Sequence, residues 1–174
     1  MKKSALIVVD TQVNMFDEAF SVYAGDRILQ TISGLIKKAR ADQADVIYVR
    51  NNGPEGEPDE PGTPGWHLHP AIAPEAGDLI IDKESPDPFD GTKLQEELAD
   101  RGINSVIIVG MQTEMCVSTT VRQAVKRGYT VTLVEDGHTT FNWDEITAVE
   151  AIAQHNKDLA QLANLQKAQV VEFG

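Results

Sequence analysis

The stretch SVIIVG at residues 105–110 is a continuous apolar run that ends in a glycine. A half-exposed strand would alternate polar and apolar residues, whereas an unbroken apolar run predicts a strand buried on both faces of a parallel sheet. Helical periodicity follows from Thr113 to Gly128, with Val117 and Val121 on the buried side. A buried strand followed by an amphipathic helix is typical of α/β proteins with a parallel sheet.

The same alternation extends outward in both directions. Further strands are predicted at Ala5–Asp10, Val46–Arg50, Leu79–Asp82, Thr130–Glu135 and Gln169–Phe173. We therefore expect a three-layer α/β/α arrangement, with a parallel sheet covered by helices on both faces. A chain of 174 residues fits one domain with a substantial core, so residues 1–174 are predicted to form a single domain.

Helical patterns lie between most of these strands. One helix is predicted after Asp26 as N-cap, and another from Thr92, which forms a capping box with Gln95, to Gly102. The last is predicted from Asp144 to Leu165. Its buried side would carry Ile146, Val149, Ile152, Leu159 and Leu162.

Composition limits the partners and the compartment. The formal net charge of −12 argues against nucleic acid and anionic membranes, which bind basic patches. The single cysteine cannot form an internal disulfide, and no apolar stretch is long enough for a signal peptide or a membrane helix. We expect a cytoplasmic protein that acts on a small molecule. The sequence contains no dinucleotide fingerprint or phosphate-cradling glycine loop, so no cofactor is predicted.

Chemically useful side chains follow three of the predicted strands. Asp10 ends the first strand, Lys83 follows the third, and Cys116 comes shortly after Gly110. Ligands of such sheets bind at the carboxyl ends of the strands. We therefore predict one site, with Cys116 as nucleophile, Asp10 as proton carrier and Lys83 as the cation that keeps Asp10 ionised. If Thr113 caps the next helix, the helix N-terminus would lower the thiol pKa from about 8.5.

Residues 51–77 interrupt the alternation. They are rich in proline, glycine and acidic residues and show no helical pattern. A long loop without secondary structure in a compact domain is usually functional or mobile. We interpret it as a lid or a wall of the substrate site.

Several longer motifs follow one another along nearly the whole chain. They are DTQVNMF at 10–16, PGTPGW at 61–66, Lys83, FDGTKL at 89–94, GMQTEMCV at 110–117 and GYTV at 128–131. Together they resemble the isochorismatase-like cysteine hydrolase superfamily. The resemblance implies a six-stranded parallel sheet and an Asp10–Lys83–Cys116 catalytic triad. It also implies a cis peptide between Met111 and Gln112, and an oxyanion hole made by the backbone N–H groups of Gln112 and Cys116.

The activity implied by this resemblance is hydrolysis of a non-peptide C–N bond in a small amide. The acidic net charge favours an uncharged or cationic substrate. Cys116 would attack the carbonyl carbon, the amine would leave, and water would hydrolyse the thioester while Asp10 moves the protons. Two alternatives stay open: an isochorismatase-type vinyl-ether hydrolase, and a non-catalytic protein in which Cys116 responds to oxidants. Members of the family commonly assemble, so the resemblance also implies a homo-oligomer.

The sequence departs from the metal-binding members of the superfamily. Relatives similar to nicotinamidase carry metal-binding histidines after the second strand, where this chain reads VRNN at 49–52. No metal is therefore predicted there. A further set would be His67 and His69 with Asp59 or Glu60, although a structural role is favoured for both histidines.

Three aromatic residues are candidates for the pocket lining: Phe16, Trp66 and Phe141. Packing in the core or in a loop is the alternative for each. His138 follows the fifth predicted strand, and we expect it to form a hydrogen bond within its loop.

Overall fold

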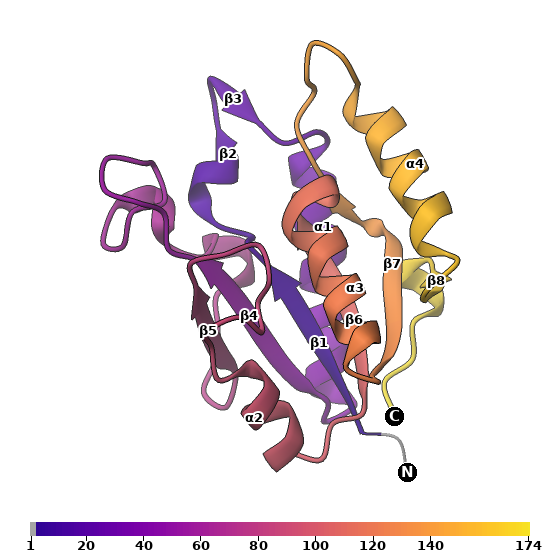
Figure 1. Ribbon diagram of the computed structural model, residues 1–174. Helices are drawn as coiled ribbons and strands as arrows, with labels where there is room; N and C mark the ends of the chain where they lie inside the picture. The colour runs from indigo at the N-terminus through magenta and orange to yellow at the C-terminus, as the bar shows by residue number, and fades with distance from the viewer. Residues whose placement is uncertain (1–2) are drawn as a thin grey trace.

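The computed structural model describes residues 3–174, which are organised around a six-stranded parallel sheet (Figure 1). Its strands are β1 (Ser4–Val9), β4 (Asp45–Asn51), β5 (Leu79–Lys83), β6 (Ser105–Met111), β7 (Thr130–Thr139) and β8 (Asn164–Gln166). They lie in the order β5-β4-β1-β6-β7-β8, and every pair is parallel. The chain runs outward from β1 on one side and from β6 on the other. The topological switch point, where such sheets bind ligands, therefore lies between β1 and β6.

Helices cover both faces of the sheet, as predicted. They are α1 (Gly25–Ala41), α2 (Leu94–Asp100), α3 (Ser118–Lys126) and α4 (Ala148–Leu159). The buried side of α1 belongs to one hydrophobic cluster, and apolar residues of α2, α3 and α4 belong to a second cluster on the opposite face. In Figure 1, α3 crosses in front of the sheet and α1 runs behind it. Across residues 3–174, every helix is too short or too polar to span a bilayer.

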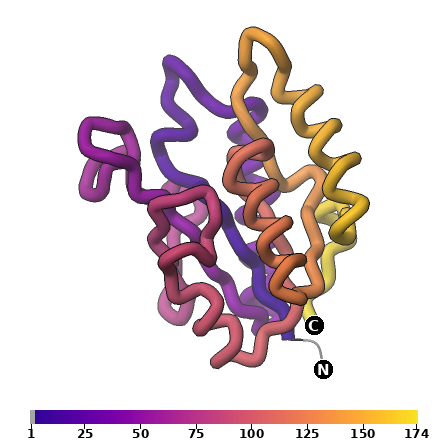
Figure 2. The backbone as a smooth tube through the Cα atoms, viewed as in Figure 1, coloured from indigo at the N-terminus to yellow at the C-terminus, as the bar shows by residue number. Residues whose placement is uncertain are grey.

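The C-terminal strand is displaced from its predicted position. The sixth strand is β8 at Asn164–Gln166, whereas Ala168–Val170 form a 3-10 helix. Val171 and Phe173 are buried in the cluster that includes α1, so this apolar run packs beneath a helix instead of joining the sheet. The chain then ends beside the start of β1, where the Gly174 N–H donates to Ser4 Oγ at 3.3 Å (Figure 2).

The last helix is shorter than predicted. It begins at Ala148, because Thr147 and Glu150 form a reciprocal capping box that satisfies the first free N–H groups. Val149 and Leu162 were expected to face inward, but they are 53% and 45% exposed. The N-terminal end of this helix is therefore set by its cap, not by the preceding apolar residues.

The other helix starts differ in smaller ways. α1 begins at Gly25, so Asp26 lies in its first turn and is not its cap. The capping box predicted at Thr92 is absent, because the Gln95 side chain donates to Tyr129 Oη at 2.8 Å instead. Thr92 Oγ1 nevertheless accepts from the Leu94 N–H at 3.2 Å and so still stabilises the start of α2.

Residues 51–77 form a long loop whose first part projects at the left of Figure 2, whereas Leu68 and Ile72 in its second part pack into the hydrophobic cluster that includes α1. Two short 3-10 helices, Pro64–Trp66 and Pro70–Ile72, break up its length. Gln12 fastens the loop to the sheet: its Nε2 donates to the carbonyl oxygens of Asn51 and Trp66, both at 3.0 Å, and its Oε1 accepts from the Asn51 N–H at 2.8 Å. A small hairpin of β2 (Phe16–Asp17) and β3 (Phe20–Ser21), which the sequence did not predict, stands near the same edge of the sheet.

Candidate active site

Asp10, Lys83 and Cys116 lie together at the carboxyl edge of the sheet. Lys83 Nζ is 3.1 Å from Asp10 Oδ2 and 3.4 Å from Cys116 Sγ. The Lys83 and Asp10 side chains are 0% and 2% exposed, and Asn51 Oδ1 accepts a further hydrogen bond from Lys83 at 3.0 Å. The three residues that the sequence placed at the ends of different strands are therefore joined through one buried ammonium group.

The central strands bring these side chains into register. Asp10 directly follows β1 and has a φ of 45°, while its N–H donates to Val49 O at 2.8 Å. Gly110, in β6, has a φ of 127°, and a Cβ at this position would lie 2.1 Å from Val9 O. Glycine is required there because β6 and β1 run too close together for a side chain. This close approach brings the segment after β6 next to Asp10.

Cys116 lies in a single π-turn, Thr113–Val117, that leads into α3. The preceding Met111–Gln112 peptide is cis, as the resemblance implied. The Gln112 carbonyl accepts from the N–H groups of Met115 and Val117 at 3.2 and 3.1 Å, which fixes the turn. The Gln112 N–H has no backbone acceptor within residues 3–174, and Gln112 lines the cavity above Cys116. Isolated π-turns are frequent at functional sites.

His138 supports the π-turn from β7. Its Nδ1 is 2.8 Å from Thr113 Oγ1, and its Nε2 is 2.8 Å from Asn156 Oδ1 on α4. The expected bond within a loop is therefore wrong, because His138 lies inside a strand and links two other elements. Burial lowers its pKa to about 4, so the imidazole is neutral at pH 7.

The environment of Cys116 holds the thiol protonated. Burial raises its pKa to about 12, the Asp10 carboxylate adds to the rise, and Lys83 opposes it. This result is opposite to the lowering expected from a helix N-terminus, because desolvation and the neighbouring carboxylate both disfavour a thiolate. Burial also raises the pKa of Asp10, while the Lys83 ammonium lowers it. Asp10 Oδ1 is buried and has no hydrogen-bond partner among the described residues.

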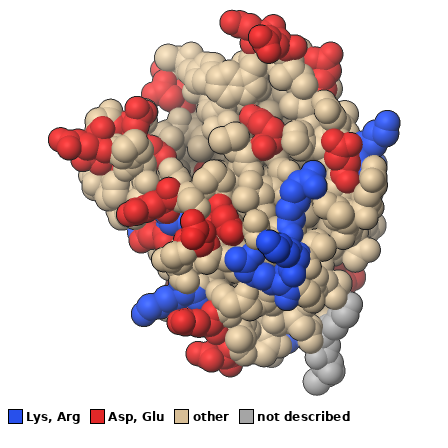
Figure 3. Space-filling model, viewed as in Figure 1, with Lys and Arg blue, Asp and Glu red and all other residues tan. Residues whose placement is uncertain are grey.

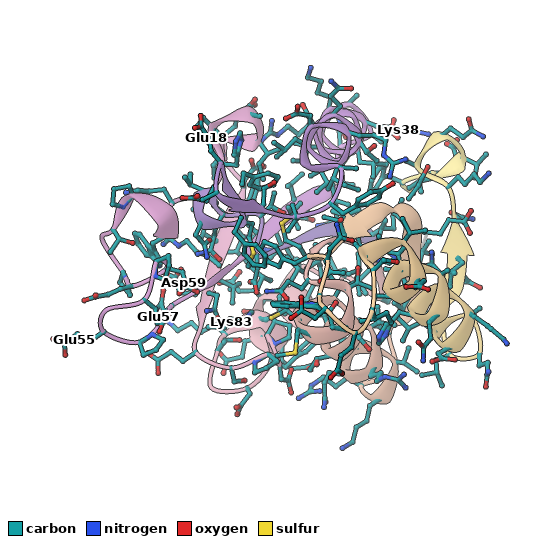
Figure 4. The ribbon with its side chains drawn as sticks, turned by 90° about the horizontal axis from the view of Figure 1, so that it is seen from above. Glu18, Lys38, Glu55, Glu57, Asp59 and Lys83 are labelled. Atoms are coloured by element: carbon teal, nitrogen blue, oxygen red, sulfur yellow. The ribbon has the colours of Figure 1, made fainter. Side chains whose placement is uncertain are left out.

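A cavity of about 810 Å³ opens above these residues. Asp10, Gln112 and Cys116 lie at its reactive end. Its apolar walls are formed by Met15, Phe20, Met115, Phe141 and Trp143. Glu57 and Asp59 reach it from the projecting loop; Figure 4 shows this loop on one side of the molecule, with Lys83 further in.

Two of the three predicted aromatic residues lie outside this cavity. Phe16 packs edge-on against His69, with ring centroids 4.8 Å apart. Trp66 donates from Nε1 to Asn52 Oδ1 at 2.8 Å, and the Arg50 guanidinium lies 3.6 Å from its ring centroid. Both rings therefore serve to pack the loop against the sheet, and neither lines the cavity.

Phe141 does line the cavity, together with two aromatic residues that sequence reasoning missed. Phe20 stacks on Phe141 with ring centroids 4.5 Å apart, and Trp143 lies 5.8 Å from both rings. Their exposure distinguishes these two residues from core aromatics, but exposure cannot be read from the sequence before the fold is known. Phe20 and Trp143 are 53% and 46% exposed.

The further metal set suggested by the sequence does not assemble. His69 Nδ1 accepts from the Ala71 N–H at 3.2 Å, while Asp59 Oδ2 accepts from Asn51 Nδ2 at 2.7 Å and Glu60 Oε2 accepts from the Gly56 N–H at 2.8 Å. Within residues 3–174, no three His, Cys, Asp or Glu side chains are grouped so that they could hold a metal ion. These residues instead hold the loop in shape.

Comparison with known proteins agrees with this geometry. A family model described as Isochorismatase domain matches residues 4–167. A streptothricin hydrolase of Streptomyces noursei is 37% identical over 138 residues, which cover 79% of this chain and 55% of that protein. A second streptothricin hydrolase of this organism is 36% identical, with 50% of its length covered. This chain therefore spans about half the length of these two relatives.

Other relatives match over more of their length. A ureidoacrylate amidohydrolase, RutB of Stutzerimonas stutzeri, is 27% identical over 164 residues, covering 73% of this chain and 66% of that protein. The crystal structure of an isochorismatase from Pseudomonas putida KT2440 is 28% identical with a TM-score of 0.87, covering 99% of this chain and 92% of that one. Since the family match takes in nearly all of the described residues, this chain belongs to the isochorismatase family and has the fold of an isochorismatase-like hydrolase.

Proposed function

We propose that this chain is a cysteine hydrolase that cleaves a C–N bond of a small amide through a thioester on Cys116. The observation that carries the proposal is the position of Lys83 Nζ, within 3.1 Å of Asp10 Oδ2 and 3.4 Å of Cys116 Sγ at the end of an 810 Å³ cavity. Packing does not require a buried carboxylate, a buried ammonium and a thiol at one sheet edge. A nucleophile, a proton carrier and an orienting cation do require that arrangement.

The first half of the reaction follows from the protonated thiol. As Sγ attacks the substrate carbonyl carbon, its proton passes to Asp10, because a thiol with a pKa of about 12 is not a thiolate beforehand. Negative charge then forms on the carbonyl oxygen. The N–H groups of Gln112 and Cys116 would donate to that oxygen, and the acceptor-free Gln112 N–H supports this role.

The second half returns the enzyme to its starting state. Asp10 gives its proton to the departing nitrogen as the C–N bond breaks, which leaves an acyl group on Cys116. Asp10, again a carboxylate, removes a proton from a water molecule that attacks the thioester carbon. The thiolate then leaves and takes back that proton. The ion pair with Lys83 stabilises Asp10 while Asp10 is ionised.

The relatives' names support C–N chemistry over the alternatives. One is an amidohydrolase, and two are streptothricin hydrolases. A vinyl-ether hydrolase would need no acyl-enzyme and so gives Cys116 no task. An oxidant-responsive role is disfavoured because the chain has one cysteine, so a sulfenic acid could not be resolved within the molecule.

The test is a panel of small amides assayed for amine release, together with intact-protein mass spectrometry after rapid acid quenching. We expect turnover by the native chain, an acyl adduct on Cys116, and loss of both in Cys116→Ala. Gln123→Ala changes a residue of α3 that does not line the cavity and serves as the control. Unchanged amine release by Cys116→Ala would rule the thioester mechanism out.

We further propose that the chain works as a homo-oligomer in the cytoplasm. The support is the family resemblance for assembly and the single free cysteine for a reducing compartment. Sedimentation velocity at micromolar concentration is expected to give a mass above that of one chain. A monomeric mass would contradict assembly, and cell fractionation tests the compartment.

A further inference from the structure

The cavity is lined by hydrogen-bond acceptors that have no donors. Asp10 Oδ1, Asn14 Oδ1 and Glu114 Oε2 are buried oxygen atoms without a hydrogen-bond partner within residues 3–174. All three residues line the 810 Å³ cavity. A buried acceptor left without a donor is unfavourable. Asn14 Oδ1 and Glu114 Oε2 are therefore acceptors that N–H groups of a ligand in this cavity could fill, whereas Asp10 is the proposed acceptor of the Cys116 proton.

The charges of the lining have one sign. Glu57, Asp59, Glu84 and Glu114 line the cavity, and none forms an ion pair with a described residue. No lysine or arginine is found among the lining residues of the part of the chain described. Figure 3 shows acidic side chains gathered on the projecting loop and beside the hollow next to it, with most of the basic side chains on this face lying lower or further to the right. Such a cavity attracts cations and repels anions.

Lys83 does not offset this charge, because its ammonium group is already paired with Asp10. A positive group on the ligand would therefore meet carboxylates in the cavity lining and no competing cation. An anionic substrate group would meet the four unpaired carboxylates without a basic partner. The four carboxylates of the lining therefore all favour a cationic ligand over an anionic one.

Glu114 is held in place for such a contact. Its Oε1 accepts from Thr140 Oγ1 at 2.8 Å and from Trp143 Nε1 at 3.2 Å, which leaves Oε2 without a partner. Glu114 is also two residues from Cys116, in the same π-turn. The rings of Trp143 and Phe141 lie beside it in the lining, and aromatic faces attract cations. A cation bound to Glu114 would therefore lie near the end of the cavity that holds Cys116.

We propose that the substrate is a cationic amide, whose alkylammonium or guanidinium group binds Glu114 beside the Phe141–Trp143 wall while its carbonyl meets Cys116. This inference rests on the proposed function for the identity of the scissile bond. The charge preference itself depends only on the cavity, so binding can be measured apart from turnover.

The test uses three probes of matched length: 4-aminobutyramide, which is cationic, pentanamide, which is neutral, and glutaramate, which is anionic. Their affinities for Cys116→Ala are measured by isothermal titration calorimetry, because that variant cannot consume the probe through Cys116. We expect 4-aminobutyramide to bind at least about tenfold more tightly than glutaramate, as one favourable contact in place of a repulsive one requires. Added salt should reduce the difference.

Variants in the same background locate the binding group. Glu114→Gln retains the Oε1 acceptor for Thr140 and Trp143 but removes the charge, and we expect it to weaken 4-aminobutyramide about tenfold. Glu84→Gln, in the exposed part of the lining, should weaken it less, and it provides a second reading if Glu114→Gln folds poorly. Glu96→Gln makes the same charge change on α2, away from the cavity, and should leave the affinity unchanged.

The outcomes separate the two proposals. Equal affinity for the three probes, tighter binding of glutaramate, or no binding of any probe would overturn the cationic-substrate inference. Release of ammonia from neutral amides by the native chain would still support the hydrolase. A clear cation preference that disappears in Glu114→Gln would support the inference, even if the native chain released ammonia from none of the probes and the proposed function failed.

Discussion

His138 Nδ1 accepts a hydrogen bond from the hydroxyl of Thr113, at 2.8 Å, and so connects β7 to the π-turn that carries Cys116. The direction of this bond follows from the other side of the ring. His138 Nε2 faces Asn156 Oδ1, whose own amide nitrogen donates to Glu135 O at 3.0 Å. Nε2 must therefore carry the proton and Nδ1 must be an acceptor. Both nitrogens of the neutral ring are satisfied, and protonation would place a second donor opposite Thr113.

The burial of His138 predicts a pH-dependent stability. The pKa of His138 is lowered from 6.5 to about 4 by burial, so between these values the unfolded chain binds a proton that the folded chain does not. The contribution is present above pH 6.5 and is lost as the pH falls, by about 2 kcal/mol between pH 7 and pH 5. Urea unfolding at both pH values should show this loss in the native chain and a smaller loss in His138→Gln. Equal losses in the two proteins would contradict the prediction.

The buried pair of Lys83 and Asp10 predicts a pattern of single and double substitutions. Lys83→Met should abolish activity and lower the free energy of unfolding at pH 7 by about 3 kcal/mol, because it leaves a buried carboxylate without its cation. Asp10→Asn combined with Lys83→Met removes both charges and should recover much of that stability but no activity. Lys126→Met, at an exposed position of α3, is the matched control. A double variant as unstable as Lys83→Met would show that the loss comes from packing.

The close approach of β1 and β6 makes Gly110 the most sensitive glycine. Gly110→Ala combines a φ of 127° with a Cβ placed 2.1 Å from Val9 O, so we expect a loss of more than about 3 kcal/mol in unfolding free energy, or failure to fold. Gly34→Ala is the control: it lies inside α1, where the added Cβ would have no atom within 4 Å apart from the local helix backbone, and it should gain about 0.5–1 kcal/mol. Thermal melting of the two variants checks both signs. Similar melting temperatures would contradict the packing argument.

The sequence predicted what depends on regular patterns. The five continuous apolar runs became β1, β4, β5, β6 and β7, and the residues at their carboxyl ends met at one edge. Burial on both faces, which such runs predict, holds for β1 and β6, but it is wrong for β5, which lies at the edge of the sheet with Ile80 38% exposed. β8 escaped detection because its three residues lie at the edge of the sheet and only Leu165 is half-buried.

The cavity walls could not be predicted because they combine distant turns. Phe20 comes from the β2–β3 hairpin, and Trp143 from the connection before α4, yet both lie against Phe141. Nothing in the local sequence distinguishes them from Phe16 and Trp66, which pack elsewhere. The hydrogen bonds by which Gln12 holds the loop were not predicted for the same reason, since the partner residue Asn51 is 39 positions away.

The reactivity of Cys116 tests the electrostatics of the whole site. A thiol whose pKa is raised to about 12 by burial and by Asp10 should react with iodoacetamide more slowly at pH 8 than the same thiol in urea, whose pKa is near 8.5. Asp10→Asn removes one of the two main causes of the rise and should speed alkylation, whereas Lys83→Met removes the group that opposes it and should slow alkylation. The two variants therefore move in opposite directions, although both are expected to lose hydrolase activity. A native thiol that titrates well below 8.5 would instead require a preformed thiolate, and Asp10 could then take no proton from Cys116 during attack.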